Sequence, residues 1–168
     1  MVDHAGDESE PDNMTDPTSL ADRLVLILAR KPVSFNSGGK EKYKQAIAEE
    51  ARVCWTTDSL VGDLYARVLW FYRERAIGRD GDADNISKPI LDALKEIAFH
   101  DDRQVVKRLV QKVYTGDAFQ LVEARASGSM LRDLTRLLGE PHPHIIYIEI
   151  GRFLSRDVVL GPIDGVSP

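Results

Sequence analysis

Carboxylates gather at two places in the middle of the chain where the hydrophobic pattern breaks. Residues 79–85 read Arg-Asp-Gly-Asp-Ala-Asp-Asn, and residues 100–105 read His-Asp-Asp-Arg-Gln-Val. Asp82 and Asp84 are two positions apart, so an extended backbone would direct both side chains to one side. Lys88 follows Asp84 by one helical turn and can reach the same face. Two carboxylates about 4 Å apart repel by about 4 kcal/mol at an effective dielectric constant of about 20, so a cation, a proton or a basic side chain must relieve them.

The oxygen ligands at these positions favour Mg²⁺ or Mn²⁺ as the cation. No Cys or His pair has a spacing that suits zinc, and magnesium sites often combine a few carboxylates with an incoming phosphate. A calcium-binding EF-hand is excluded. Asp80, Asp82 and Asp84 match its first ligand positions, but Asn85 stands where the loop needs Gly and Leu91 where it needs Glu.

A purely structural role is the alternative for the same residues. Asp84 or Asn85 could cap a helix, which contributes about 1 kcal/mol. Asp84, Lys88 and Asp92 have the i, i+4, i+8 spacing of a solvated stripe of ion pairs. Residues 101–102 could form a turn. Composition and spacing alone leave this alternative open.

The hydrophobic pattern predicts the elements that must position these residues. The predicted strands span 24–29, 64–73, 105–114 and 144–150, and the predicted helices span 40–54, 85–98 and a stretch over 130–138. The order is β-α-β-α-β-α-β, so we expect one α/β or α+β domain, with a mixed sheet of about four strands packed with helices. Pro89 should then lie in the first turn of its helix, where a missing N–H costs least.

Charge and composition are those of a globular protein with an acidic start. The chain has 168 residues, 43% of them apolar, and a net charge of −5. Residues 1–22 hold seven acids and no Lys or Arg, which leaves 20 acids against 22 bases in the rest. We expect a disordered acidic tail over 1–22, a domain over 23–155 with a helical insert at about 115–143, and a C-terminal tail over 156–168.

Basic residues flank the carboxylates and could contact phosphates, which dominate affinity for nucleic acids. The main candidates are Arg75, Arg79, Lys107 and Arg108, and further ones are Lys40, Lys42, Lys44, Arg73 and Lys112. The longest apolar run, 24–29, is too short to cross a bilayer, and no secretory signal opens the chain. Cys54 has no partner for an intramolecular disulfide. We therefore expect no membrane association and a cytoplasmic location.

Three segments together resemble the signature of the RusA-type Holliday junction resolvases. That signature is D-x-D-N-x-x-K, then D-A-L, then an aromatic residue shortly before D-D-x-Q-V. The matching segments are Asp-Ala-Asp-Asn-Ile-Ser-Lys-Pro at 82–89, Leu-Asp-Ala-Leu at 91–94 and Phe-His-Asp-Asp-Arg-Gln-Val at 99–105. Residues 31–36, Lys-Pro-Val-Ser-Phe-Asn, also resemble the family's Pro-x-Ser-x-Asn loop after the first strand. The insert at 115–143 and the acidic tail depart from compact family members.

The resemblance implies a function and a set of site residues. The metal-binding carboxylates would be Asp82, Asp84 and Asp102, and the essential lysine Lys88; Asp101 is the neighbouring alternative to Asp102. Family members are homodimers that use Mg²⁺ to cut four-way DNA junctions by paired nicks in recombination and repair, so the protein would be nucleoid-associated. Two other functions stay open: a non-cleaving relative that binds junctions or DNA in a regulatory role, and a metal-dependent hydrolase of another phosphodiester.

Overall fold

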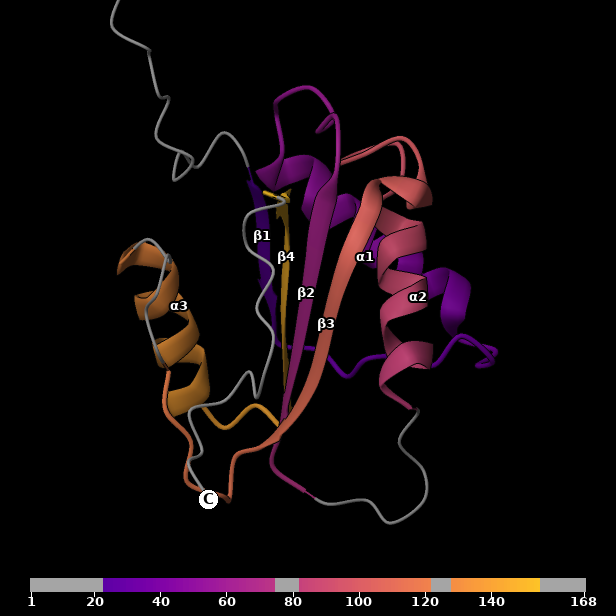
Figure 1. Cartoon of the computed structure of the whole chain (residues 1–168). Helices are drawn as coiled ribbons and strands as arrows, with labels where there is room; N and C mark the ends of the chain where they lie inside the picture. Colours follow the sequence, from indigo (N-terminus) through magenta and orange to yellow (C-terminus); the bar gives the residue numbers. More distant parts are fainter. Residues whose placement is uncertain (1–22, 75–81, 122–127, 155–168) are drawn as a thin grey trace, which may run out of the picture.

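The computed structural model describes residues 23–74, 82–121 and 128–154, so the two predicted tails lie outside the described residues. The strands are β1 (Arg23–Leu28), β2 (Leu64–Tyr72), β3 (Val105–Tyr114) and β4 (His144–Arg152). The helices are α1 (Lys40–Cys54), α2 (Ala83–Leu94), the short 3-10 helix η2 (Asp102–Gln104) and α3 (Gly128–Gly139). The single α+β domain with a four-stranded mixed sheet is confirmed (Figure 1).

The sheet places the last strand of the chain between the first two. Its order is β1-β4-β2-β3. β4 is antiparallel to both β1 and β2, whereas β2 and β3 are parallel. α1 and α2 lie on one face of the sheet and α3 lies on the other (Figure 1). The parallel pair requires a crossover connection, and α2 lies in it.

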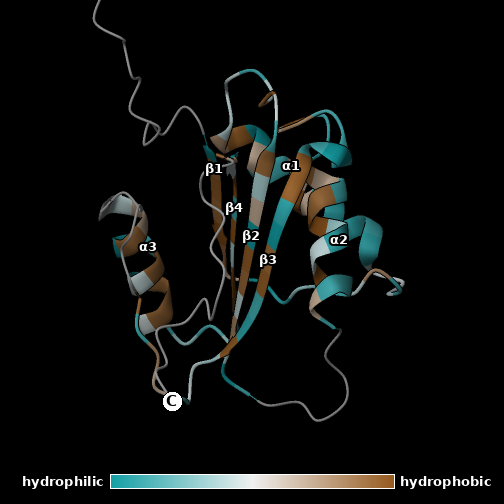
Figure 2. Cartoon of the chain, viewed as in Figure 1, coloured by the Kyte–Doolittle hydropathy of each residue, from teal (hydrophilic) through white to brown (hydrophobic). Residues whose placement is uncertain are grey.

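The main core lies between the sheet and the pair α1 and α2. Alternate residues of β1, β2 and β4 point into it, as the period of two in their sequences predicts. Those with the least exposed side chains include Leu24, Leu64, Val68, Ile146, Ile148 and Ile150. Figure 2 shows hydrophobic residues along these strands and on the side of α2 toward the sheet, with hydrophilic residues on its outer side. Trp70 is 1% exposed, so it packs in the core.

The helical stretch predicted over 130–138 is the amphipathic helix α3, which covers the second face. Leu134 packs there with Phe71, Ile145 and Tyr147. Arg73, one of the candidate phosphate contacts, holds the end of α3 instead. Its guanidinium donates hydrogen bonds to the carbonyl oxygens of Leu138, Glu140 and His142 at 2.8, 2.6 and 2.9 Å. The carbonyl of Leu138 lies in the last turn of α3, where carbonyls lack partners within the helix, so Arg73 caps the C-terminal end of α3.

A buried carboxylate joins three strands on the α3 side of the sheet. Glu149 is 3% exposed, and it accepts hydrogen bonds from the hydroxyls of Tyr65 and Tyr147 at 2.6 and 3.0 Å. Arg67 and Arg23 complete the group, with nitrogen-to-oxygen distances of 3.3 and 3.5 Å. Burial, and then the Glu149 charge, raise the pKa values of both tyrosines. Both hydroxyls therefore stay protonated and act as donors.

Replacing Glu149 should destabilise the fold strongly. We expect Glu149→Ala to lower the free energy of unfolding by roughly 3 kcal/mol, the lower end of the range for breaking a buried ion pair, because it removes the charge that faces Arg67 and Arg23 and leaves two tyrosine hydroxyls without their acceptor. The exposed Glu50 on α1 is the matched control, and Glu50→Ala should change stability by about 0.5 kcal/mol or less. Urea unfolding followed by circular dichroism measures both. Equal unfolding midpoints for the two variants would contradict the buried-network interpretation.

Candidate active site

α2 is displaced toward the N-terminus relative to its predicted span of 85–98. It starts at Ala83, after Asp82 in extended conformation, and ends at Leu94. The end is set by the backbone, because Lys95 is extended and Glu96 has a φ of +63°, in the left-handed region. The predicted boundaries are therefore wrong at both ends, by two and by four residues.

This earlier start places Pro89 in the second turn of α2, not in the first turn as predicted. Proline has no N–H, so the carbonyl of Asn85, four residues earlier, loses its normal partner within the helix. The N–H of Phe35 donates to that carbonyl at 2.9 Å. The loop between β1 and α1 is thereby hydrogen-bonded to the first turn of α2. This is the loop that carries the Pro-x-Ser-x-Asn pattern.

Asp82 and Asp84 begin α2 with both side chains exposed. Asp82 is the N-cap residue, but its side chain makes no capping hydrogen bond. Within the described residues no ion pair joins Asp84, Lys88 and Asp92, so the stripe of ion pairs is not formed. Neither structural alternative accounts for the two carboxylates, and their oxygens are accessible to a ligand. Lys88 instead places its ammonium nitrogen 4.6 Å from the centre of the Phe35 ring.

The two carboxylates of the second group differ in their surroundings. Asp101 caps η2: it accepts a hydrogen bond from the N–H of Arg103 at 2.9 Å and pairs with the same residue's guanidinium at 2.7 Å. The Arg103 side chain, and then its N–H, lower the pKa of Asp101 to about 2. Asp102 is exposed, and no hydrogen bond or ion pair holds its carboxylate within the described part of the chain. Asp101 is occupied structurally, and Asp102 is available as a ligand.

Gln104, the glutamine of the D-D-x-Q-V pattern, fixes the position of this turn. Its side-chain oxygen accepts hydrogen bonds from the N–H groups of His100 and Asp101, both at 2.9 Å. Its amide nitrogen donates to the carbonyls of Leu60 and Gly62 at 3.0 and 3.3 Å. The turn that carries Asp102 is therefore fastened to the loop before β2. Sequence reasoning assigned no role to Gln104, although an acid followed three positions later by Gln is a capping-box pattern.

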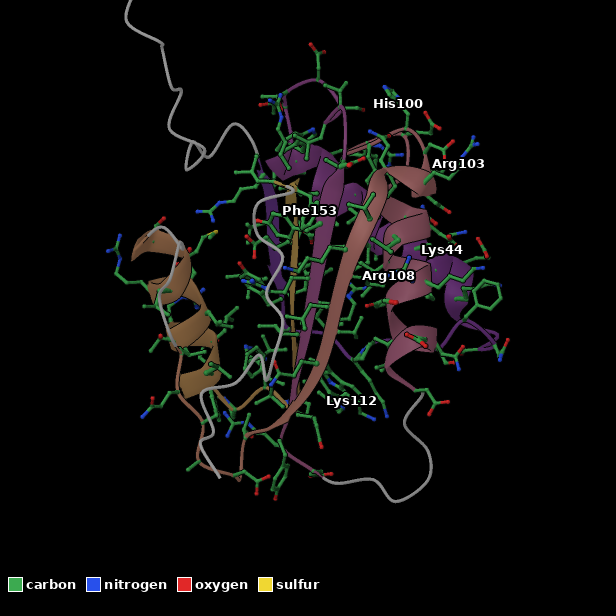
Figure 3. The ribbon with its side chains drawn as sticks, viewed as in Figure 1. Lys44, His100, Arg103, Arg108, Lys112 and Phe153 are labelled. Carbon is green, nitrogen blue, oxygen red and sulfur yellow. The ribbon has the colours of Figure 1, made fainter. Side chains whose placement is uncertain are left out.

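The two groups of carboxylates lie at opposite ends of α2. A helix of its 12 residues is about 18 Å long. In Figure 1 the first turn of α2 lies at the lower end of the sheet, whereas the turn after α2 lies at the upper end. Figure 3 shows Lys112 toward the lower end and His100 and Arg103 at the upper end. Among the residues that the structure describes, no three His, Cys, Asp or Glu side chains gather to hold a metal ion. Asp82 and Asp84 thus lie at the start of α2, with Asp84 already in helical conformation, and Asp102 lies beyond the other end of the helix.

The predicted phosphate contacts on β3 face opposite sides of the sheet. Arg108 is paired in register with Ala66, whose side chain lies in the core on the α1 and α2 side. Lys107 points to the other side, where its ammonium nitrogen lies 5.6 Å from the centre of the Phe153 ring. Arg108 and Lys112 are drawn beside α2 in Figure 3. Arg75 and Arg79 lie outside the described residues.

Comparison with known proteins identifies one family. A family model described as Endodeoxyribonuclease RusA matches residues 30–123, which is more than half of the chain. The match includes the loop after β1, both groups of carboxylates and β3, and it excludes α3 and β4. No match was found among curated proteins. Within the described residues, no helix is both long enough and apolar enough to cross a membrane.

The pairing of Asp101 with Arg103 should make stability depend on pH in acid. The pKa of Asp101 is about 2 in the folded chain against an ordinary value of 3.8, so its contribution is complete above pH 3.8 and is lost as the pH falls toward 2. Asp101→Asn should lower the urea midpoint at pH 6, and the difference from wild type should narrow at pH 2.5. The neighbouring Asp102→Asn is the control and should match wild type at both pH values. An Asp101→Asn difference that is the same at both pH values would rule out the charge effect.

Proposed function

Because the chain belongs to the endodeoxyribonuclease RusA family, we propose that it is a Mg²⁺-dependent endonuclease that resolves four-way DNA junctions by paired nicks in recombination and repair. The observation that carries the proposal is the pair Asp82 and Asp84: two exposed carboxylates at one end of α2, with no partner within the described residues and with Lys88 one turn away. A protein that only binds DNA gains nothing from two acids that repel each other and the DNA backbone.

The donor set fits a hard divalent cation. Asp82, Asp84 and Asp102 offer carboxylate oxygens, which suit Mg²⁺, with Mn²⁺ as a substitute. When bound there, Mg²⁺ supplies polarisation of the scissile phosphate and a lower pKa for the attacking water. Lys88 would stabilise the negative charge that grows on the phosphate in the transition state, while Arg108 would bind the DNA backbone. No covalent intermediate with the protein is needed.

The positions of the carboxylates at the two ends of α2 support a homodimer. Ligands of one magnesium ion must all lie about 2.1 Å from it, but the length of α2 separates Asp102 from Asp82 and Asp84 in one chain. In a two-fold dimer, the Asp102 end of one protomer can meet the Asp82 end of its partner, and symmetry then creates the same contact a second time. Two equivalent sites match a substrate in which two opposite strands are cut.

The first test is cleavage of a labelled synthetic four-way junction beside a linear duplex. We expect symmetric nicks in the junction that require Mg²⁺ and disappear with EDTA. Asp82→Asn, Asp84→Asn and Asp102→Asn should abolish them, and Lys88→Ala should slow them by about 10²- to 10³-fold. Glu50→Gln, at an exposed position of α1 outside the motif, is the control and should cleave normally. A junction that is bound but uncut with either Mg²⁺ or Mn²⁺ would favour the non-cleaving relative, and equal cutting of linear duplex would remove the junction selectivity.

The shared site is tested by mixing two inactive variants. In the proposed dimer, each site takes Asp82 from one protomer and Asp102 from the other. A heterodimer of Asp82→Asn with Asp102→Asn therefore has both substitutions in one site, and its other site is intact. After random exchange of protomers, nicking should return to about a quarter of the wild-type level, because half of the dimers carry one good site of two. Sites built within single chains would give no recovery. Sedimentation velocity on the mixture checks that dimers have formed.

A further inference from the structure

Two lysines share one aromatic ring at the Asp82 end of α2. The ammonium nitrogen of Lys40 lies 4.2 Å from the centre of the Phe35 ring, and that of Lys88 lies 4.6 Å from the same point. Both distances are within the range of about 6 Å for cation–π attraction. The two nitrogens are therefore no farther apart than the sum of these distances. Lys40 is the first residue of α1, so the ring joins the beginnings of two helices.

The position of the ring is fixed by backbone hydrogen bonds on both sides. The N–H of Phe35 donates to the carbonyl of Asn85 in α2 at 2.9 Å. On the other side, the N–H of Ser37 donates to Ser34 at 2.9 Å, and the N–H of Lys40 donates to Ser37 at 3.2 Å. This turn leads directly into α1. The backbone that carries the ring is thus held at a set place relative to α2 and to the first residue of α1.

No acidic side chain neutralises either lysine within the described part of the chain. Two ammonium groups beside one ring repel each other, and anions bound to them would offset that repulsion. A lysine carries a point charge on a flexible four-carbon stem, so contact with a fixed ring limits the positions that its charge can take. A charged pair that is held in place but lacks a counter-charge is suited to binding an anion.

We propose that Lys40 and Lys88 form a clamp for two neighbouring phosphates of one DNA strand, with Phe35 as its positioning residue. Lys88 contacts the phosphate that is cut, and Lys40 contacts an adjacent phosphate. Phosphates of one strand follow each other by about 3.4 Å along the duplex axis, so two consecutive phosphates lie within the reach of this pair. The clamp rests on the proposed function, and it adds to that function a binding residue, Lys40, and a reason for the aromatic residue in the loop after β1.

The test of Lys40 is the salt dependence of junction binding by the full chain, measured in EDTA so that no cleavage occurs. Each phosphate contact adds about 0.9 to the slope of log affinity against log salt for duplex DNA. Lys40→Gln should reduce that slope by about one such unit, and Lys40→Arg should keep it. Arg52, exposed in the last turn of α1, is the control: Arg52→Gln removes the same charge from the same helix and should leave the slope unchanged.

Phe35 is tested by comparing two replacements. Phe35→Tyr keeps an aromatic face for the lysines and should bind and cut as wild type does, whereas Phe35→Leu fills similar space without that face and should weaken junction binding several-fold. Lys40→Gln should then add little to Phe35→Leu, because the clamp is already lost. Urea midpoints of both variants identify any loss of folding, and Phe35→Tyr keeps the test valid if Phe35→Leu unfolds.

The outcomes separate this clamp from the proposed function. If the wild-type chain cuts the junction and Lys40→Gln has the wild-type salt slope, the clamp is overturned and the nuclease stands. If Phe35→Leu behaves as Phe35→Tyr does, Phe35 has no positioning role and the clamp is likewise overturned. If the wild-type chain neither binds nor cuts the junction, both proposals fall together.

Discussion

The packing of α2 against α1 and the sheet determines where every residue of the carboxylate motif lies. Ile86, Ile90 and Leu94 follow each other at helical spacing, and none is more than 1% exposed. Burying an aliphatic side chain of this size contributes about 1.5–3 kcal/mol, so α2 cannot slide or turn without losing several such terms together. The helix is therefore a rigid spacer. It sets Asp82 and Asp84 at one end of the domain and the turn with Asp102 at the other.

Because Pro89 has no N–H, α2 gains a hydrogen bond to the loop after β1, and this bond also supports the site. Pro89 in the body of a helix normally costs about 3 kcal/mol, in part because a carbonyl loses its partner. Here the carbonyl of Asn85 is satisfied from outside the helix by the N–H of Phe35. The same proline therefore removes one bond within α2 and makes a docking point for the loop after β1. The hydrogen bond to this carbonyl joins two distant segments of the chain, the loop with Phe35 and the helix with Lys88.

Much of this arrangement could be predicted from the sequence. Alternating and helical hydrophobic patterns predicted four strands and three helices, and for α1 and β3 the predicted boundaries agree with the structure. The start of α2 could not be predicted as well, because Asp82, Asp84 and Asn85 are all good N-cap residues and spacing does not choose among them. The burial of Glu149 also has no signal in its own strand. It depends on tyrosines and arginines from β1, β2 and β4 that meet only in the folded sheet.

The separation of the carboxylates was implicit in the predicted helix, since a helix of that length cannot bring its two ends to one metal ion. The resemblance to the RusA family nevertheless implied that Asp82, Asp84 and Asp102 bind one metal site. That common site remains a prediction. What sequence spacing does not contain is the arrangement of one chain against another. The contact of two lysines with the ring of Phe35 could not be predicted either, because it depends on where the loop after β1 meets α2.

The order of the strands has a consequence for how the protein is made. β4 lies between β1 and β2, and residues 23–28 pair with residues 146–151. Until the last strand has been synthesised, only β2 and β3 can pair, and the aliphatic residues of β1 have no neighbour to cover them. Contacts between residues so far apart in sequence slow folding, because a long loop must close before they form. Until β4 has been made, the nascent chain therefore exposes an unpaired sheet edge and a hydrophobic face. During that time it can bind chaperones or aggregate.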